Sequence, residues 1–222
     1  MKSLALTISF ALSLAGSPCM SAEPNGGWEK IFDGKSLDGW TTTDGKPPGK
    51  GWKVEDGNLI LDGEGGNLVS EKDYSSFELE WEWKISEGGN NGVKYWVTAV
   101  DGKSWLGIEY QMIDDKRHPD GLRGGSHTTA SIYDIKEVAK DKPLNPPGDW
   151  NSSKVMVKDG KIQHFLNGQV VCEADTTTEE WKKMIAASKF KKLQGFAPGK
   201  GRIMLTDHGD KCWFRNIRIR NL

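Results

Sequence analysis

The sequence predicts an all-β sandwich of the jelly-roll type, with long loops and at most one short helix. The main reason is a period-two alternation of apolar and charged residues. It is clearest in residues 77–85, where Phe, Leu, Trp, Trp and Ile share one face and charges share the other. Glycine supplies 27 of the 222 residues, more than the usual ~7%, and much of it separates short apolar runs. Regularly spaced strands of this kind favour two packed antiparallel sheets.

The remaining elements follow from local patterns. Asn167-Gly168 predicts a tight hairpin, because Asn-Gly suits a two-residue turn. Thr178 followed by Glu179 and Glu180 predicts a short helix over 178–189. The proline-rich segment 117–150 is the least regular part, and we expect it beside the functional site. The other predicted strands are residues 52–61, 92–100, 107–113, 155–157, 162–172, 202–206 and 212–219.

Residues 1–22 have the pattern of a signal peptide. Lys2 precedes an apolar run over 4–15, and small residues end at Ala22. The sequence therefore predicts residues 23–222 as one exported domain, periplasmic or secreted, with no membrane span. Cys19 lacks the usual lipoprotein context, so unmodified export is favoured over a lipid anchor.

Charge and cysteine content narrow the class of protein. Removing residues 1–22 leaves 29 basic and 31 acidic residues, a net charge of −2. This charge balance gives no indication of the basic surface that a nucleic-acid partner would require. Cys172 and Cys212 are either disulfide-bonded after export or two buried thiols, and the sequence leaves both open.

Candidate catalytic residues gather in residues 107–118. Glu109 and Gln111 are two apart on a predicted strand and therefore share a face. Asp114, Asp115 and His118 follow at the end of that strand. A solvated strand face is the alternative, since most exposed acids have no specific role.

Two further positions could transfer protons or bind a metal. His164 lies beside the predicted hairpin turn, on the face opposite Phe165. Asp207 and His208 lie in a loop between two strands, where they could act as an acid/base pair or as metal ligands. A structural histidine and an ordinary turn are the alternatives.

Several segments resemble the 3-keto-disaccharide hydrolases, also described as 3-keto-glucoside-1,2-lyase/3-keto-2-hydroxy-glucal hydratase domains. The resemblance extends in order over about residues 28–222 and implies the concanavalin A-like lectin/glucanase sandwich. The sequence differs from the motif expected for this family at one segment, Arg123-Gly124-Gly125-Ser126-His127. The segments that carry the resemblance are residues 34–40, 90–95, 107–115, 131–134, 162–168, 201–203, 207–209 and 214–217.

The resemblance implies a chemistry. A ketone at C3 of a sugar acidifies the C2 hydrogen, so that a base can remove it and the C1 oxygen can leave by elimination; water then adds to the 2-hydroxy-glycal. Such a site needs a base, an acid and a cation or donor for the enolate. The candidates are Glu109, His164 and His208 for proton transfer, and Asp207 and Asp115 for a divalent ion such as Ca²⁺ or Mn²⁺. The candidate substrate-binding residues are Lys94, Gln111, Asn91, His118, Tyr133 and Asn167.

The expected partner is a small carbohydrate. Two other classes fit the same fold, a non-catalytic carbohydrate-binding module and a conventional glycoside hydrolase. The module would not need the candidate residues to converge, and the hydrolase would need a pair of carboxylates.

Overall fold

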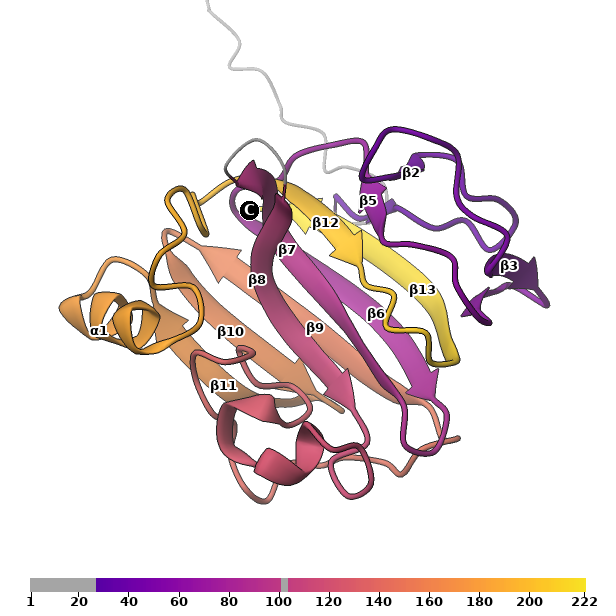
Figure 1. Ribbon diagram of the computed structural model, residues 1–222. Helices are drawn as coiled ribbons and strands as arrows, with labels where there is room; N and C mark the ends of the chain where they lie inside the picture. Colours follow the sequence, from indigo (N-terminus) through magenta and orange to yellow (C-terminus); the bar gives the residue numbers. More distant parts are fainter. Residues whose placement is uncertain (1–26, 101–103) are drawn as a thin grey trace, which may run out of the picture.

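A computed structural model describes residues 27–100 and 104–222 of the chain. The predicted signal peptide and Cys19 lie outside these residues. Two antiparallel β-sheets face each other and enclose the hydrophobic core (Figure 1), which confirms the predicted β-sandwich. No helix in the described part of the chain is long and apolar enough to cross a membrane.

The larger sheet has the strand order β11-β10-β9-β6-β13-β4-β3, and β1 also pairs with β13. Its C-terminal strand β13 therefore lies in the interior of the sheet, between β6 on one side and β4 and β1 on the other. The strands are β1 (Glu29–Lys30), β3 (Trp52–Glu55), β4 (Asn58–Leu61), β6 (Phe77–Ile85), β9 (Asn151–Lys158), β10 (Lys161–Leu166), β11 (Gln169–Asp175) and β13 (Cys212–Asn221).

The smaller sheet has the order β2-β5-β12-β7-β8. Strands β7 and β8 are the long ones and pair in register along most of their length. Strands β1, β2 and β5 span two or three residues each, too few for periodicity to predict them. The strands of this sheet are β2 (Trp40–Thr42), β5 (Leu68–Ser70), β7 (Asn90–Val100), β8 (Ser104–Ile113) and β12 (Arg202–Leu205).

The core lies between the sheets and is rich in aromatic residues. Trp81 of the larger sheet meets Tyr110 of the smaller one edge to face, with ring centroids 4.9 Å apart. Because neighbours along a strand point to opposite faces, residues flanking Tyr110 point away from this core. The smaller sheet therefore has an outer face on which polar side chains can lie.

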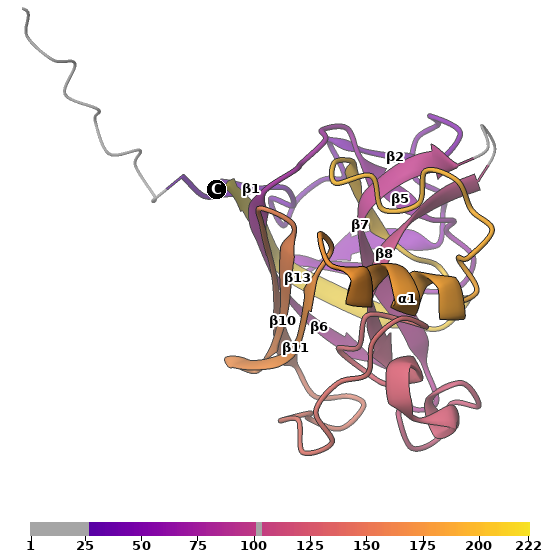
Figure 2. The same cartoon turned by 90° about the vertical axis from the view of Figure 1, so that its left-hand side faces the viewer.

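The predicted hairpin and helix are confirmed. Asn167 and Gly168 have φ of 47° and 84°, the left-handed values that a type I′ turn requires. Helix α1 (Glu179–Ala187) begins after Thr178, whose side chain accepts a hydrogen bond from the Trp181 backbone N–H. Trp181 packs into the core, and Figure 2 shows α1 across the edge between the two sheets.

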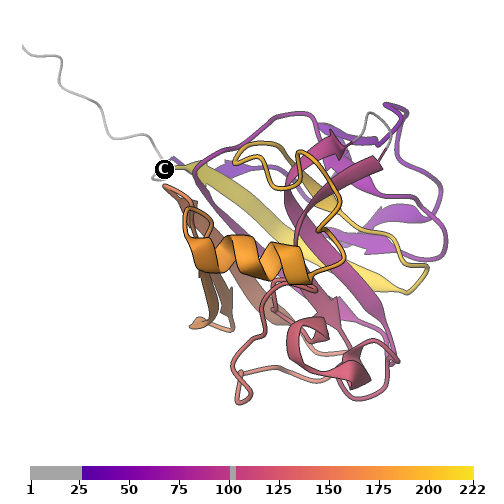
Figure 3. The same ribbon diagram turned by 60° about the vertical axis from the view of Figure 1, so that its left-hand side comes forward.

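The irregular segment after β8 contains two short 3-10 helices, η1 (Gly121–Arg123) and η2 (Gly125–His127). Figure 3 shows this segment below α1, at the same side of the sandwich. Residue Tyr133 returns to β8, where its backbone N–H donates to the carbonyl of Glu109. The segment is thus fastened beside Glu109, which agrees with the expectation that it borders the site.

Cys172 and Cys212 are both buried free thiols. Of the two alternatives that the sequence left open, the structure has the unpaired one.

Candidate active site

Glu109 lies on the outer face of the smaller sheet. Its strand neighbours Ile108 and Tyr110 are part of the core, so the pleat directs Glu109 the other way. Lys94 of β7 occupies the directly opposed position in the register, and its Nζ is 3.4 Å from Glu109 Oε2. The two side chains are only 16% and 6% exposed. A charge pair so shielded interacts more strongly than one in open water.

Gly92 leaves the space that Glu109 occupies. A Cβ added at Gly92 would lie 2.4 Å from Glu109 Oε1 and 3.0 Å from its carboxyl carbon. These distances are shorter than van der Waals contact, so any side chain at position 92 would displace the carboxylate. The absence of a side chain here therefore fixes where the acid group sits.

Gln111 and Asn91 lie in the same region but are buried. Gln111 shares the face of Glu109, as predicted, and its Oε1 accepts a hydrogen bond from the Met112 backbone N–H. Asn91 donates to the Thr206 carbonyl at 2.8 Å and accepts from the Gly92 N–H. Asn91 thereby links β7 to the end of β12 and supports the site from the core side of the sheet.

Tyr133 borders Glu109 through the backbone hydrogen bond described above. Its hydroxyl donates to Asp120 Oδ2 at 2.7 Å. Burial, together with this hydrogen bond and the charge of Asp120, raises the pKa of Tyr133. The phenol therefore keeps its proton at neutral pH and acts as a donor.

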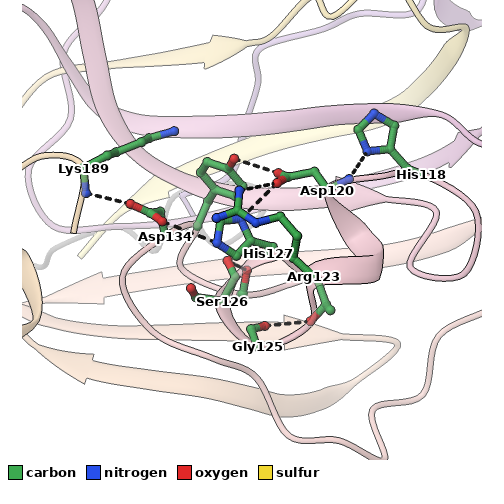
Figure 4. A network of polar contacts seen from close by, with 11 residues as sticks. His118, Asp120, Arg123, Gly125, Ser126, His127, Asp134 and Lys189 are labelled. Atoms are coloured by element: carbon green, nitrogen blue, oxygen red, sulfur yellow. Dashed lines mark hydrogen bonds and ion pairs between the residues drawn. The ribbon is translucent and has the colours of Figure 1, made fainter. Parts of the chain in front are cut away.

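Behind Tyr133, a buried histidine lies between two carboxylates (Figure 4). His127 Nδ1 lies 3.3 Å from Asp120 Oδ1, an ion-pair distance without hydrogen-bond geometry, and Nε2 lies 3.4 Å from Asp134 Oδ1. Burial raises the pKa of Asp120, but hydrogen bonds from Tyr133 and Arg123 outweigh it and hold that pKa below its ordinary value. These contacts among Asp120, His127 and Asp134 hold the 120–134 segment in one conformation.

Lys189 joins this cluster from the residue pair that follows α1. Its backbone N–H donates to Asp134 Oδ2 at 2.7 Å, and its ammonium lies 4.1 Å from the centre of the Tyr133 ring. Burial lowers the pKa of Lys189, and the negative charge of Glu109 partly offsets this effect.

His208 lies in the loop after β12. Its neighbour Asp207 accepts hydrogen bonds from the backbone of Gly65, Gly66 and Gly209, so Asp207 shapes the loop. Surrounding atoms lower the pKa of the His208 imidazole by desolvation, and the charge of Glu109 again opposes the shift. His208 is nevertheless exposed at the surface.

The two predicted metal ligands have other partners. Asp207 is engaged with three backbone N–H groups, whereas Asp115 accepts from the Thr129 N–H and pairs with Lys142 at 2.7 Å. Across residues 27–100 and 104–222 no three His, Cys, Asp or Glu side chains are grouped to hold a metal ion. Dependence on a divalent ion stays a prediction that chelation can test.

His164 is where the structure departs most from the expected site. It is 0% exposed and lies between the sheets, with Nε2 bonded to the Tyr95 hydroxyl and Nδ1 to the Ala130 carbonyl, both at 2.9 Å. Burial lowers its pKa to about 4. Both nitrogens are thus engaged in the core and face no solvent, so the structure does not bring His164 to Glu109, and a role of His164 in proton transfer stays a prediction.

Asn167 and His118 also hold the backbone rather than the site. Asn167 donates to the Pro143 carbonyl and accepts from the Ser152 N–H, which fixes the hairpin turn. His118 Nδ1 accepts from the Asp120 N–H, and in Figure 4 its ring lies on the opposite side of Asp120 from His127. Neither has a described contact with Glu109 or Lys94.

Sequence reasoning missed Asp120, His127, Asp134 and Lys189. The first three lie in the irregular segment, where no periodicity indicates the direction of a side chain. Lys189 is the last residue of the predicted helix, at the start of a lysine-rich stretch that resembles a solvated surface. The density of Asp and His around Tyr133 was the signal available.

The two facing sheets, with a shielded carboxylate on one outer face, define a β-sandwich of the glucanase and lectin type. A Bacillus licheniformis β-glucanase has this fold, with a TM-score of 0.55 at 12% identity over 90% of this chain and all of that one. The family described as 3-keto-alpha-glucoside-1,2-lyase-like domain matches residues 27–220, and the chain belongs to this family.

Two relatives are more similar in sequence. A 3-keto-disaccharide hydrolase of Bacteroides thetaiotaomicron is 34% identical over 229 residues, covering 88% of this chain and 79% of that protein. The crystal structure of a candidate glycosyl hydrolase from Parabacteroides distasonis is also 34% identical. It has a TM-score of 0.80 and covers 88% of this chain and 94% of that one. The resemblance noted in the sequence is thus confirmed at the level of family and fold.

Proposed function

We propose that the protein cleaves 3-keto glycosides by elimination followed by hydration, on the outer face of the smaller sheet. The observation that carries this proposal is the shielded Glu109–Lys94 pair. It combines a carboxylate base and a cation in one place, and family membership supports a substrate that bears a ketone.

In the first step Glu109 acts as the base. The C3 ketone acidifies the C2 hydrogen, so Glu109 takes that proton and the electrons of the C2–H bond pass to the C3 oxygen. The resulting enolate is stabilised by a positive charge or a hydrogen-bond donor placed beforehand. The ammonium charges of Lys94 and Lys189 both act on this region.

In the second step the enolate electrons return and the C1–O bond breaks. His208 protonates the leaving oxygen, which completes the elimination to a 2-hydroxy-glycal that keeps the C3 ketone. The neutral imidazole then accepts a proton from the water that adds to C1, and Glu109 returns its proton to C2. The products are a 3-keto sugar and the free aglycone, and both residues recover their starting protonation states.

The experiment that tests this function follows the C2 hydrogen. Turnover of a 3-keto glucoside in D₂O should place deuterium at C2 of the released sugar, as read by NMR. The matching unoxidised glucoside should react far more slowly, because its C2 hydrogen is not acidified. Retention of the C2 hydrogen with cleavage of the unoxidised sugar would indicate a conventional glycosidase. Binding without turnover of either would indicate a carbohydrate-binding module.

We also propose that the protein is exported and acts in the periplasm or outside the cell. The support is the signal-peptide pattern of residues 1–22.

A further inference from the structure

The ammonium group of Lys189 is held by aromatic rings. Its Nζ lies 4.1 Å from the centre of the Tyr133 ring and 5.1 Å from that of Phe190. Among the described ion pairs none joins Lys189 Nζ to a carboxylate within 4.0 Å. Contact with the face of a ring stabilises a cation without using its N–H donors in strong hydrogen bonds. Those donors are therefore available to an incoming oxygen.

The backbone on both sides of Lys189 is fixed. Its own N–H donates to Asp134 Oδ2, and the next N–H, of Phe190, donates to the Ser188 hydroxyl. The Phe190 ring stacks on Phe196 with centroids 4.1 Å apart and an interplanar angle of 10°. In Figure 4 the side chain of Lys189 extends away from Asp134, so the ammonium and the backbone anchor lie at opposite ends. The backbone at Lys189 is therefore anchored, while its side chain lies along the Tyr133 ring and stays exposed to solvent.

Tyr133 links Lys189 to the strand that carries Glu109. Tyr133 contacts Lys189 through its ring and Glu109 through its backbone N–H. After desolvation, the charge of Glu109 is the largest influence on the pKa of Lys189, followed by the charge of Lys94. The charges of both lysines thus act on the same carboxylate, Lys94 from β7 and Lys189 from the residues after α1.

The two lysines differ in the contacts that their ammonium groups already make. Lys94 Nζ is paired with Glu109, so its charge holds the base in place. We propose that Lys189 is the catalytic residue that binds the C3 oxygen of the keto sugar and holds the enolate, while Lys94 positions Glu109. This inference rests on the proposed function and names the group that recognises the ketone. A sugar with a C3 hydroxyl develops no negative charge there, so Lys189 distinguishes oxidised from unoxidised substrates.

The test isolates proton removal from bond cleavage. A 3-keto C-glycoside carries its aglycone through carbon, so the aglycone cannot leave and only exchange of the C2 hydrogen with D₂O is observed. Lys189→Met should slow this exchange by ~100-fold or more, the usual effect of removing one donor to a developing oxyanion. Affinity for the unoxidised glucoside should stay within about twofold. Lys192→Met is the matched control, because Lys192 is exposed on the same loop, and it should exchange at the wild-type rate.

The pH dependence gives a second readout. Burial lowers the pKa of Lys189, so wild-type exchange should decline as pH rises through a value below the ordinary 10.5. Lys189→Arg keeps its charge at every accessible pH, and should lose this alkaline decline. If Lys189→Met does not fold, the Arg variant carries the test, and an unchanged alkaline decline would overturn the assignment.

Failure of this inference is distinguishable from failure of the proposed function. Wild-type protein that exchanges no C2 hydrogen from any 3-keto sugar would refute the proposed function itself. Wild-type exchange with equal exchange by folded Lys189→Met would leave that function standing and remove Lys189 from it.

Discussion

Glu109 and Lys94 face each other across two neighbouring strands, with Oε2 and Nζ 3.4 Å apart and both side chains shielded from solvent. Each strand contributes its residue through the pleat, so neither depends on a loop for its position. Sites built on strands hold their geometry more tightly than sites built on loops. The pairing of the two strands therefore sets the position of the base relative to the cation.

Replacement of Glu109 by Gln should lower kcat/KM for a 3-keto glucoside by ~10²-fold or more, because the amide keeps the shape but cannot accept the C2 proton. Steady-state kinetics with circular dichroism as a folding check measures this. Glu55→Gln is the control, since Glu55 is an exposed strand residue, and it should leave the rate unchanged. Near-wild-type turnover by folded Glu109→Gln would remove Glu109 from the mechanism.

A methyl group at position 92 should displace the carboxylate of Glu109. Gly92→Ala places Cβ against Glu109 Oε1, so we expect reduced turnover and a loss of stability of about 1–3 kcal/mol, typical of overpacking. Chemical denaturation measures the stability change. In a Glu109→Ala background the carboxylate is gone and the cost should largely disappear. An equal cost in both backgrounds would show that the clash lies elsewhere.

The acid role of His208 predicts a pH profile. Desolvation lowers its pKa below the ordinary 6.5, and protonation of the leaving oxygen needs the imidazolium form. The rate of aglycone release should therefore decline as pH rises through a value below 6.5. His208→Gln should lower the rate and flatten that decline. The same decline in the His208→Gln variant would assign it to another group.

The burial of His164 predicts that the stability of the folded protein depends on pH. Its pKa is about 4 in the folded protein and about 6.5 in the unfolded chain, so the unfolded state binds the extra proton between these values. The free energy of unfolding should be complete above pH 6.5 and should fall as pH decreases, by about 2 kcal/mol between pH 6.5 and 5. Urea unfolding at several pH values measures this. His164→Gln should be less stable at pH 7 and show a smaller drop; an equal drop would contradict the assignment.

Export predicts a processed N-terminus. Mass spectrometry of protein recovered from the native host should show a chain that begins near Glu23. An intact Met1, or a lipid on Cys19, would contradict this expectation.

The strand pattern was sufficient to predict the sandwich and the shared face of Glu109 and Gln111. The same pattern misled at His164, although it correctly opposed His164 to Phe165. Hydrophobicity favours Phe165 as the core residue, yet Phe165 faces outward under the ammonium of Lys154, 4.0 Å from its ring centre, while His164 is buried. The Tyr95 hydroxyl and the Ala130 carbonyl satisfy the imidazole inside, and this tertiary compensation is invisible along the strand.

Residues outside regular elements escaped prediction for a different reason. His127 and Asp134 meet because two 3-10 turns fold the chain back on itself. Lys189 reaches Tyr133 only because α1 packs through Trp181 at the edge of the sandwich. These approaches depend on tertiary packing, for which neither periodicity nor spacing gives a rule.

The interior position of β13 has a consequence for biosynthesis. Strand β13 is made after β1, β4 and β6, and it pairs with β6 on one side and with β4 and β1 on the other, so the larger sheet cannot close before β13 has been synthesised. Folding that must wait for such distant partners is slow. Removal of β13 would leave β6 and β4 without their common partner and divide the larger sheet through its middle.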